Sequence, residues 1–249
     1  MLSIKFFCKC GFGFLVFLLT SNLHAQQLNM DVRDFNGNMQ IFDPANPSSK
    51  NNLKQSYADV DGSPFWDDKW NPAIVYFNNG TKAKINQARL NLYTDEIHYI
   101  NSVGTELAIE NQGITRLVFL NKNNLTQPIA SFAKLVNHVS GNGTAFYKVL
   151  NAGAFQLILL QKQFVKTSPY DPIQGKSISS FYTKRNYAIY NVGNIIPLDD
   201  LNKKSMLAAL GNDNNFDALV KENKSKLKSE KEITDLLEAF NLTIEKSKP

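Results

Sequence analysis

The chain has 249 residues, of which 43% are hydrophobic and 20% charged, with 27 Lys and Arg against 22 Asp and Glu and a formal net charge of +5. This length and composition are typical of one globular domain, or one domain with a small appendage, and exclude general disorder. Two of the positive charges, Lys5 and Lys9, lie in an N-terminal targeting segment, so the remainder carries +3. That excess is too small to predict nucleic-acid binding.

The first 25 residues have the pattern of a secretory signal peptide. Lys5 and Lys9 precede the apolar run 11–19, and a small residue, Ala25, ends the segment. The alternative is a membrane anchor, but the run is shorter than the roughly 20 residues that a spanning helix needs. We therefore predict cleavage near Ala25, export to the periplasm or the cell surface, and no transmembrane segment after cleavage.

Both cysteines of the chain, Cys8 and Cys10, fall inside the predicted signal peptide. The processed chain would therefore contain no thiol. A disulfide framework, a cysteine nucleophile and a thiolate metal site are all excluded by this prediction.

Residues 26–61 are rich in Asn, Asp, Ser and Pro, and we predict a partly ordered lead-in there. A turn signal follows at 61–64. Three large aromatic residues, Phe65, Trp66 and Trp70, then stand just ahead of the first clear strand.

From residue 62 to residue 197 the chain alternates apolar and polar residues in short runs separated by turn residues, which predicts an antiparallel meander with one packed and one wet face. The meander could curve or resemble a barrel. The segment 129–139 is ambiguous between strand and helix, and a last hairpin is expected between 178–182 and 187–190. The other expected strands are 73–77, 83–93, 97–100, 106–109, 114–120, 145–150 and 155–165.

After Leu198 the apolar period changes to that of helices, and residues 198–249 are expected to form three. Ser229 and Glu232 have the spacing of a capping box at the start of the third helix. We expect these helices to pack on the sheet; the alternative is a mobile tail. Strands first and helices last predict the α+β class.

Several short runs of the chain carry a resemblance: Val60 to Phe65, Val75 to Gly80, Leu90 to Ile97, and the C-terminal runs Lys221 to Lys224, Lys226 to Leu227, Ser229 to Ile233 and Phe240 to Asn241. Together they resemble a group of uncharacterised exported proteins typical of Bacteroidota. The resemblance covers most of the chain after about Val60. It implies a β-rich envelope protein with a lysine-rich helical end, and it transfers no activity and no site.

Phe65, Trp66 and Trp70 are the candidate binding residues, because exposed aromatic faces stack on sugar rings or anchor a protein partner. The alternative, favoured by the usual burial of large aromatics, is that they close one end of the sheet. His98 and His138 could join Asp95 or Glu96 in a metal site or in acid-base chemistry, but we interpret both as polar residues on the wet face of strands. No catalytic residue, metal site or cofactor is predicted.

The first functional hypothesis is therefore an exported, non-enzymatic envelope protein with a binding or assembly role, whose partner is an envelope protein or a glycan and not a nucleic acid. The second is a carrier that encloses a small apolar ligand in a curved sheet, with the helices closing its mouth. The third is a hydrolase of unrecognised type that gathers His98 or His138 with carboxylates. The sequence sets no oligomeric state.

Overall fold

A computed structural model describes residues 39–41, 57, 59–109, 113–170, 175 and 177–246, with the backbone alone at 39–41. The predicted signal peptide, residues 1–25, and most of the lead-in lie outside the described residues. Among the helices of the described part, none is long and apolar enough to cross a membrane.

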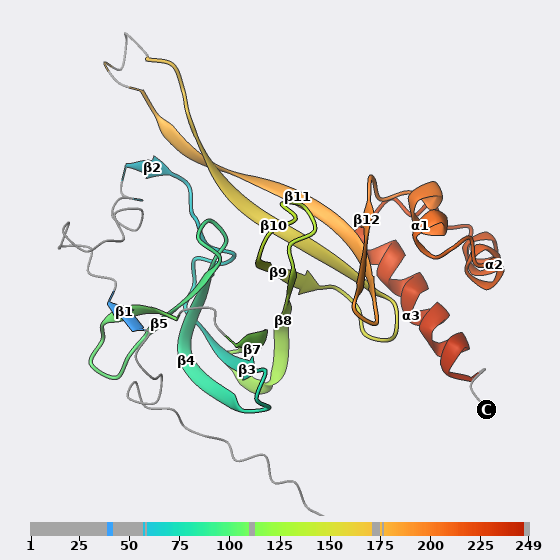
Figure 1. Ribbon diagram of the computed structural model, residues 1–249, viewed down its shortest axis with the longest axis horizontal. Coiled ribbons are helices and arrows are strands. Elements are labelled where there is room, and N and C mark those ends of the chain that lie inside the picture. Colours follow the sequence, from blue (N-terminus) through green and yellow to red (C-terminus); the bar gives the residue numbers. More distant parts are fainter. Residues whose placement is uncertain are drawn as a thin grey trace, which may run out of the picture.

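The predicted α+β class, a mainly antiparallel sheet followed by a helical segment, is confirmed (Figure 1). The sheet is not closed into a barrel. Its strands are β1 (Met39–Ile41), β2 (Val60–Asp61), β3 (Asn71–Phe77), β4 (Lys82–Asn91), β5 (Glu96–Ile100), β6 (Glu106–Ile109), β7 (Ile114–Asn121), β8 (Asn124–Val136), β9 (Thr144–Val149), β10 (Gln156–Thr167), β11 (Ser179–Asn191) and β12 (Asn194–Leu198).

Two meanders meet at the centre of the sheet, whose order is β1-β6-β5-β4-β3-β7-β8-β9-β10-β11-β12. The chain thus returns from β6 to pair β7 with β3, four positions away. The five peptide units from Ile109 to Ile114 span at most about 18 Å, less than the roughly 19 Å of four strand spacings in a flat sheet. The sheet must therefore curl, and side chains from every strand between β3 and β9 meet in one apolar core. We call β3 to β9 the curled half.

The sheet differs from the predicted meander near its second edge. The expected hairpin between 178–182 and 187–190 is wrong, because Thr183 to Asn186 pair in register with Leu160 to Gln163 and β11 runs on without a turn. The turn lies instead at Val192 and Gly193, whose φ angles are 42° and 86°. The polar run at 183–186 imitates a turn because it belongs to an exposed part of the strand.

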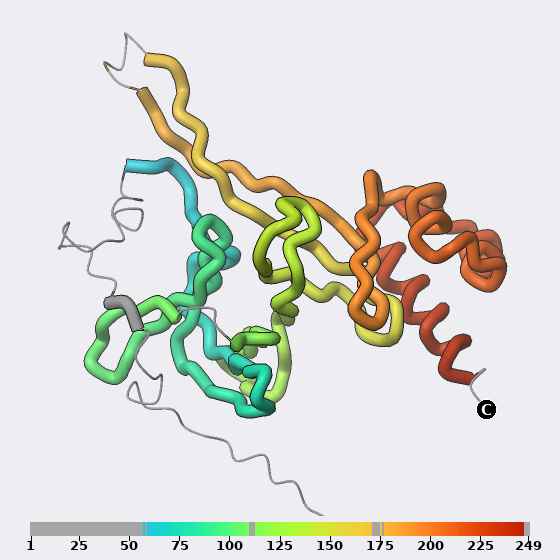
Figure 2. The backbone as a smooth tube through the Cα atoms, viewed as in Figure 1, coloured from blue at the N-terminus to red at the C-terminus, as the bar shows by residue number. Residues whose placement is uncertain are grey.

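The β10–β11 hairpin extends well beyond the rest of the sheet (Figure 2). We call its outer part, residues 161–170 and 177–186, the arm. Strand β2 pairs with the start of β11, and this short parallel pair joins Val60 to Ser179.

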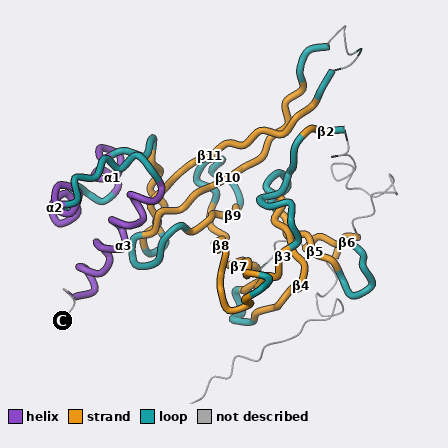
Figure 3. Tube along the Cα trace, turned by 180° about the vertical axis from the view of Figure 1, so that it is seen from behind, coloured by secondary structure: helices purple, strands orange, loops and turns teal. Residues whose placement is uncertain are grey.

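Three helices follow the sheet: α1 (Lys203–Ala209), α2 (Asn214–Glu222) and α3 (Glu230–Lys246). Their apolar sides bury Leu157, Ile189 and Leu198 of β10 to β12, and they gather at one end of the sheet (Figure 3). The Ser229 hydroxyl accepts the N–H of Glu232, as the capping box predicts. The Glu232 carboxylate reaches one residue further back than expected, to the N–H of Lys228.

One buried asparagine attaches α3 to the turn between β9 and β10. The Asn241 side chain accepts the N–H of Phe155 at 2.9 Å and donates to the carbonyls of Ala152 and Phe155 at 3.0 and 2.8 Å. Gly153 of that turn has φ +108°, and a Cβ there would lie 2.3 Å from Nδ2 of Asn241. Only glycine allows this close approach.

Candidate functional site

The aromatic segment ahead of β3 lies beside the end of β4 like a short extra strand. The N–H of Trp66 donates to the carbonyl of Leu90 at 2.9 Å, and the N–H of Leu92 donates to the carbonyl of Pro64 at 2.7 Å. Successive side chains of an extended segment point to opposite faces. Phe65 and Trp66 therefore lie on different sides of the sheet, and the three predicted aromatics do not form one surface.

Trp66 points inward and packs against the core of the curled half. Its ring stacks on Phe119, with centroids 5.2 Å apart, and meets the edge of Phe132. This position matches the alternative in which an aromatic side chain closes the sheet.

Phe65 and Trp70 lie on the outer face, where they hold an arginine between them. The guanidinium carbon of Arg89 lies 3.8 Å from the ring centroid of Phe65 and 3.9 Å from that of Trp70. Both contacts have the geometry of cation–π interactions. Arg89 therefore supports one face of the Trp70 ring from behind.

A β-bulge beside Trp70 shapes the surface. The pairing of β3 with β4 shifts from Asn71–Ala88 to Ala73–Ile85, so that Pro72 faces both Asn86 and Gln87. A bulge bends the strand and redirects side chains, and proline suits it because proline has no N–H for the ladder. Asn86 and Gln87 are consequently both exposed, although they are neighbours in a strand.

An open cavity of about 330 Å³ lies at this bulge, and we call it the bulge cavity. Its lining comes from the residue before β3, the start of β3, the middle of β4, the β7–β8 turn and the start of β8. The lining residues are Trp70, Pro72, Asn86, Gln87, Lys122 and Leu125.

The lining combines one aromatic ring with hydrogen-bonding groups. Trp70 offers an indole, the amides of Asn86 and Gln87 both donate and accept hydrogen bonds, and Lys122 donates with a positive charge. This combination suits a polar ligand with an apolar face and several hydroxyl groups, such as a sugar ring.

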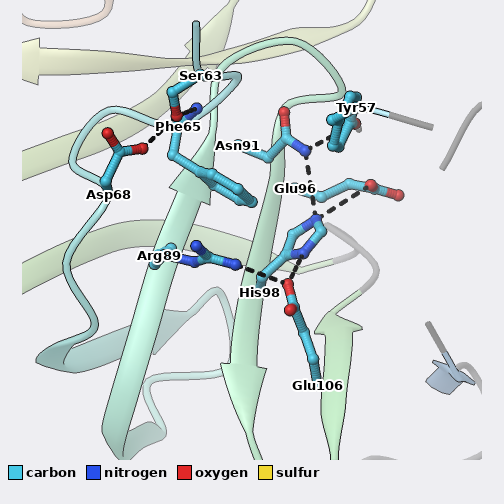
Figure 4. A network of polar contacts seen from close by, with 9 residues as sticks. All are labelled: Tyr57, Ser63, Phe65, Asp68, Arg89, Asn91, Glu96, His98 and Glu106. Atoms are coloured by element: carbon cyan, nitrogen blue, oxygen red, sulfur yellow. Dashed lines mark hydrogen bonds and ion pairs between the residues drawn. The ribbon is translucent and has the colours of Figure 1, made fainter. Parts of the chain in front are cut away.

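Behind Phe65 and Trp70, which hold Arg89 between them, lies a buried polar network (Figure 4). Nδ1 of His98 lies 2.7 Å from Oε1 of Glu106, which also accepts from Nη2 of Arg89 at 3.1 Å. Nε2 of His98 lies 3.4 Å from Nδ2 of Asn91 and 3.9 Å from Oε2 of Glu96. The network therefore connects the histidine, through Glu106, to the arginine that supports Trp70.

Burial and charge act in opposite directions on His98. Desolvation alone lowers the pKa of the imidazole, but hydrogen bonds and attraction from Glu106 and Glu96 outweigh it, so the pKa is raised. For Glu106, desolvation raises the pKa, but His98 and Arg89 outweigh this effect and the pKa is lowered. Both shifts favour a charged His98–Glu106 pair.

The interpretation of His98 as a residue on the wet face is wrong, because its side chain is 1% exposed. The ring of Phe65 covers it at a centroid distance of 5.3 Å, and Tyr57 accepts from Asn91 at the border of the network. The segment around Phe65, which lies far from β5 in the sequence, thus covers a face of β5 that the strand pattern predicts to be polar and exposed.

The network does not have the geometry of a metal site. Glu106 and Glu96 lie at opposite ring nitrogens of His98, so the two carboxylates and the imidazole do not converge on one point. Within the described ranges no group of three potential ligands could hold a metal ion.

The other two candidate residues lie elsewhere. His138 follows β8 and its Nδ1 lies 2.7 Å from the hydroxyl of Tyr147. Asp95 accepts from the buried Lys134, with its Oδ2 2.8 Å from Nζ, and also from the N–H of Phe146. Asp95 therefore stabilises the curled half through Lys134, and neither its pair nor His138 joins the network of His98.

Sequence reasoning missed Arg89, Asn86, Gln87 and Lys122. One signal was present: the adjacent polar residues Asn86 and Gln87 separate the buried Ile85 and Ala88, which breaks a strict period of two. No pattern indicated that Lys122, from another hairpin, would lie beside them.

Comparisons with known proteins found no similarity. No protein-family model matches the chain, and no curated protein and no solved structure matches it significantly. The chemistry of the bulge cavity therefore rests on its own geometry.

Proposed function

We propose that this protein is an exported, non-enzymatic binding protein of the bacterial envelope, and that it takes saccharide chains at the bulge cavity. The observation that carries the proposal is the open cavity in which Trp70 lies beside the exposed amides of Asn86 and Gln87. Export itself comes from the signal-peptide pattern of residues 1–25.

The support behind Trp70 favours binding. An aromatic side chain that must be ordered on binding loses rotamer freedom, which weakens affinity. The stacked guanidinium of Arg89 and its bond to Glu106 order the ring before a ligand arrives. Arg89 is therefore a positioning residue, and Trp70 is the residue in contact with the ligand.

The hydrolase alternative requires a histidine with carboxylates, and His98 does meet Glu106 and Glu96. A general base must reach the proton that it removes from a substrate. The His98 side chain is 1% exposed and both its nitrogens face protein groups. This geometry favours a structural role over acid-base chemistry.

The carrier alternative requires helices over the mouth of the curved sheet. The helices instead cover β10 to β12 at one end of the molecule (Figure 1). The core of the curled half holds packed aromatic side chains, among them Trp66, Phe119 and Phe132. Both observations favour surface binding over enclosure of an apolar ligand.

Tryptophan fluorescence tests the proposal directly. The chain has two tryptophans, of which Trp66 lies against the core and Trp70 lines the cavity. Titrating the processed protein with envelope polysaccharide fragments should change the emission of Trp70, and Trp70→Phe should remove the change while Trp66 still reports an intact core.

Calorimetric titration of variants supplies the control. Trp70→Ala should weaken saccharide binding at least tenfold, because it removes the stacking surface. Leu242→Ala removes an apolar side chain of α3 that is 57% exposed and is not part of the cavity lining, and it should leave affinity unchanged. Equal affinity of Trp70→Ala and the unchanged protein would reject the proposal.

A further inference from the structure

The arm carries a distinctive set of side chains on one face. In the register of β10 and β11, Lys162 lies opposite Lys184, Phe164 opposite Tyr182, and Lys166 opposite Ser180. Positions two apart in a strand share a face. These six residues, Lys162, Phe164, Lys166, Ser180, Tyr182 and Lys184, therefore form one surface, which we call the lysine face.

An aromatic pair lies at the middle of the lysine face. The rings of Phe164 and Tyr182 stack at 5.6 Å with an interplanar angle of 27°, and Nζ of Lys184 lies 5.1 Å from the centroid of Phe164. The two rings are half-buried, while Lys166 and Lys184 are exposed. The face therefore presents ring edges and ammonium groups together.

The charges on this face oppose folding of the hairpin. Like charges directly opposite each other in an antiparallel pair are destabilising, and Lys162 faces Lys184. The described part of the arm, residues 161–170 and 177–186, contains no Asp or Glu, and the exposed Asp61 of β2 lies in register with Ser180 at its edge. Within the described part of the chain none of Lys162, Lys166 and Lys184 forms an ion pair. Lys134 also lies near Lys162, but its charge is paired with Asp95.

Three lysines of the helical end, by contrast, lie next to acids. Lys203 and Lys221 both contact Asp217, and Lys231 contacts Asp235, each at 2.7 Å. The unpaired lysines of the arm thus differ from these three lysines of the helical end.

We propose that the lysine face binds an acidic polysaccharide. A linear chain of sugar rings can lie along an extended strand pair, with its carboxylate or sulfate groups on the lysines and its rings against Phe164 and Tyr182. The site is made by strands that do not line the bulge cavity, so this inference does not depend on the proposed function.

Other polyanions fit the face less well. A membrane approached by the arm would meet its end first, whereas the lysines and rings lie along its side. A nucleic acid is held by many phosphate contacts, and three lysines on a processed chain of charge +3 provide few.

The test compares two double variants of the processed protein with the same charge change. Lys162→Gln/Lys184→Gln removes charge from the lysine face, and Lys204→Gln/Lys228→Gln removes it from exposed positions at the helical end. Binding of polygalacturonate and of neutral dextran is measured by calorimetry at two salt concentrations. Circular dichroism checks that both variants fold.

We expect the arm variant to bind polygalacturonate at least tenfold more weakly and with a reduced salt dependence, and the control variant to stay within twofold of the unchanged protein. Dextran should not compete. Tyr182→Ala, which keeps all charges, should weaken binding about threefold if the rings contribute.

Three results would overturn the inference. Equal losses in both double variants would show an effect of net charge alone. Preferential binding of phosphatidylglycerol vesicles or of an oligonucleotide would assign the face to another class of partner. Loss of polygalacturonate binding in Trp70→Ala but not in the arm variant would place the acidic chain at the bulge cavity.

Discussion

The curled half and the helix-covered end of the sheet bury different kinds of side chain. The curled half encloses two charged pairs, His98–Glu106 and Lys134–Asp95, in which the His98 and Lys134 side chains are 1% and 4% exposed. The helix-covered end buries apolar side chains and the amide of Asn241. Among its ion pairs, Lys231–Asp235 is 82% and 59% exposed and Lys203–Asp217 is 41% and 26% exposed.

The difference follows from what covers each surface. Amphipathic helices cover β10 to β12 with apolar stripes, so no charged strand position is enclosed there. The outer face of β4 and β5 is instead covered by the irregular segment around Phe65, which encloses the polar positions of those strands. Mutations in the curled half should therefore act mainly through buried charges, and mutations at the helix-covered end through apolar packing and amide hydrogen bonds.

The largest effect is expected from Asp95→Ala. The change leaves the ammonium group of Lys134 buried without its carboxylate, which should lower the free energy of unfolding by about 3 to 5 kcal/mol. Urea denaturation measures the loss. Asp199→Ala, at an exposed aspartate, is the control and should have no effect; equal stability of the two variants would contradict a buried charged pair.

Asn241→Ala tests the attachment of the helical end. It removes three hydrogen bonds and leaves the N–H of Phe155 without its acceptor, so we expect a loss of about 2 to 3 kcal/mol. Hydrogen exchange should rise in α3 and in residues 151–155. The exposed Asn223, whose amide contacts its own helix, provides a control in Asn223→Ala. Unchanged exchange in α3 would exclude Asn241 as the anchor.

The His98–Glu106 pair predicts a pH dependence. The pKa of His98 is raised in the folded protein. Its contribution to the free energy of unfolding is therefore complete below its ordinary pKa of 6.5 and is lost as the pH rises through its folded-state pKa. The pKa of Glu106 is lowered in the folded protein. Its contribution to the free energy of unfolding is therefore present above its ordinary pKa of 4.5 and is lost as the pH falls through its folded-state pKa. The pair should therefore stabilise the protein most between about pH 4.5 and 6.5.

Glu106→Gln measures that contribution. At pH 6 the variant should lose about 1 to 2 kcal/mol of unfolding free energy, and at a pH above the raised pKa of His98 it should lose less, because the imidazole is then neutral in both proteins. Urea denaturation at the two pH values gives the comparison. An equal loss at both would mean that the pair is not charged in the folded protein.

The smallest effect is expected at the helical surface. Lys231→Ala breaks an exposed pair on α3, and the urea midpoint should stay unchanged at low and high salt. A clear shift of the urea midpoint at low salt would mean that ion pairs stabilise the helical end as well as the curled half, which would contradict the difference drawn between the two regions.

Much of the secondary structure could be predicted from local pattern. Val75 and Leu90 lie in buried strand positions, and Ser229 caps the start of α3 as its spacing indicates. These features depend on the chain's own periodicity and on bonds within a few residues. The segment 129–139, ambiguous in sequence, became most of β8 because β7 and β9 pair with both its edges.

The candidate site could be predicted only in part. Trp70 was named from its residue type, but its separation from Trp66 depends on which face each occupies beside β4. The burial of His98 depends on Phe65, 33 positions earlier in the chain. A strand pattern marks a face as polar without showing whether another segment covers it.

The amino-acid sequence alone determined the α+β class and most of the strands and helices, because periodicity and turn chemistry act between near neighbours. The tertiary structure decided the return of β7 to β3, the bulge cavity beside Trp70 and the burial of two charged pairs. Each of these depends on contacts between distant segments, where pairing and burial are settled by the packing of the whole chain.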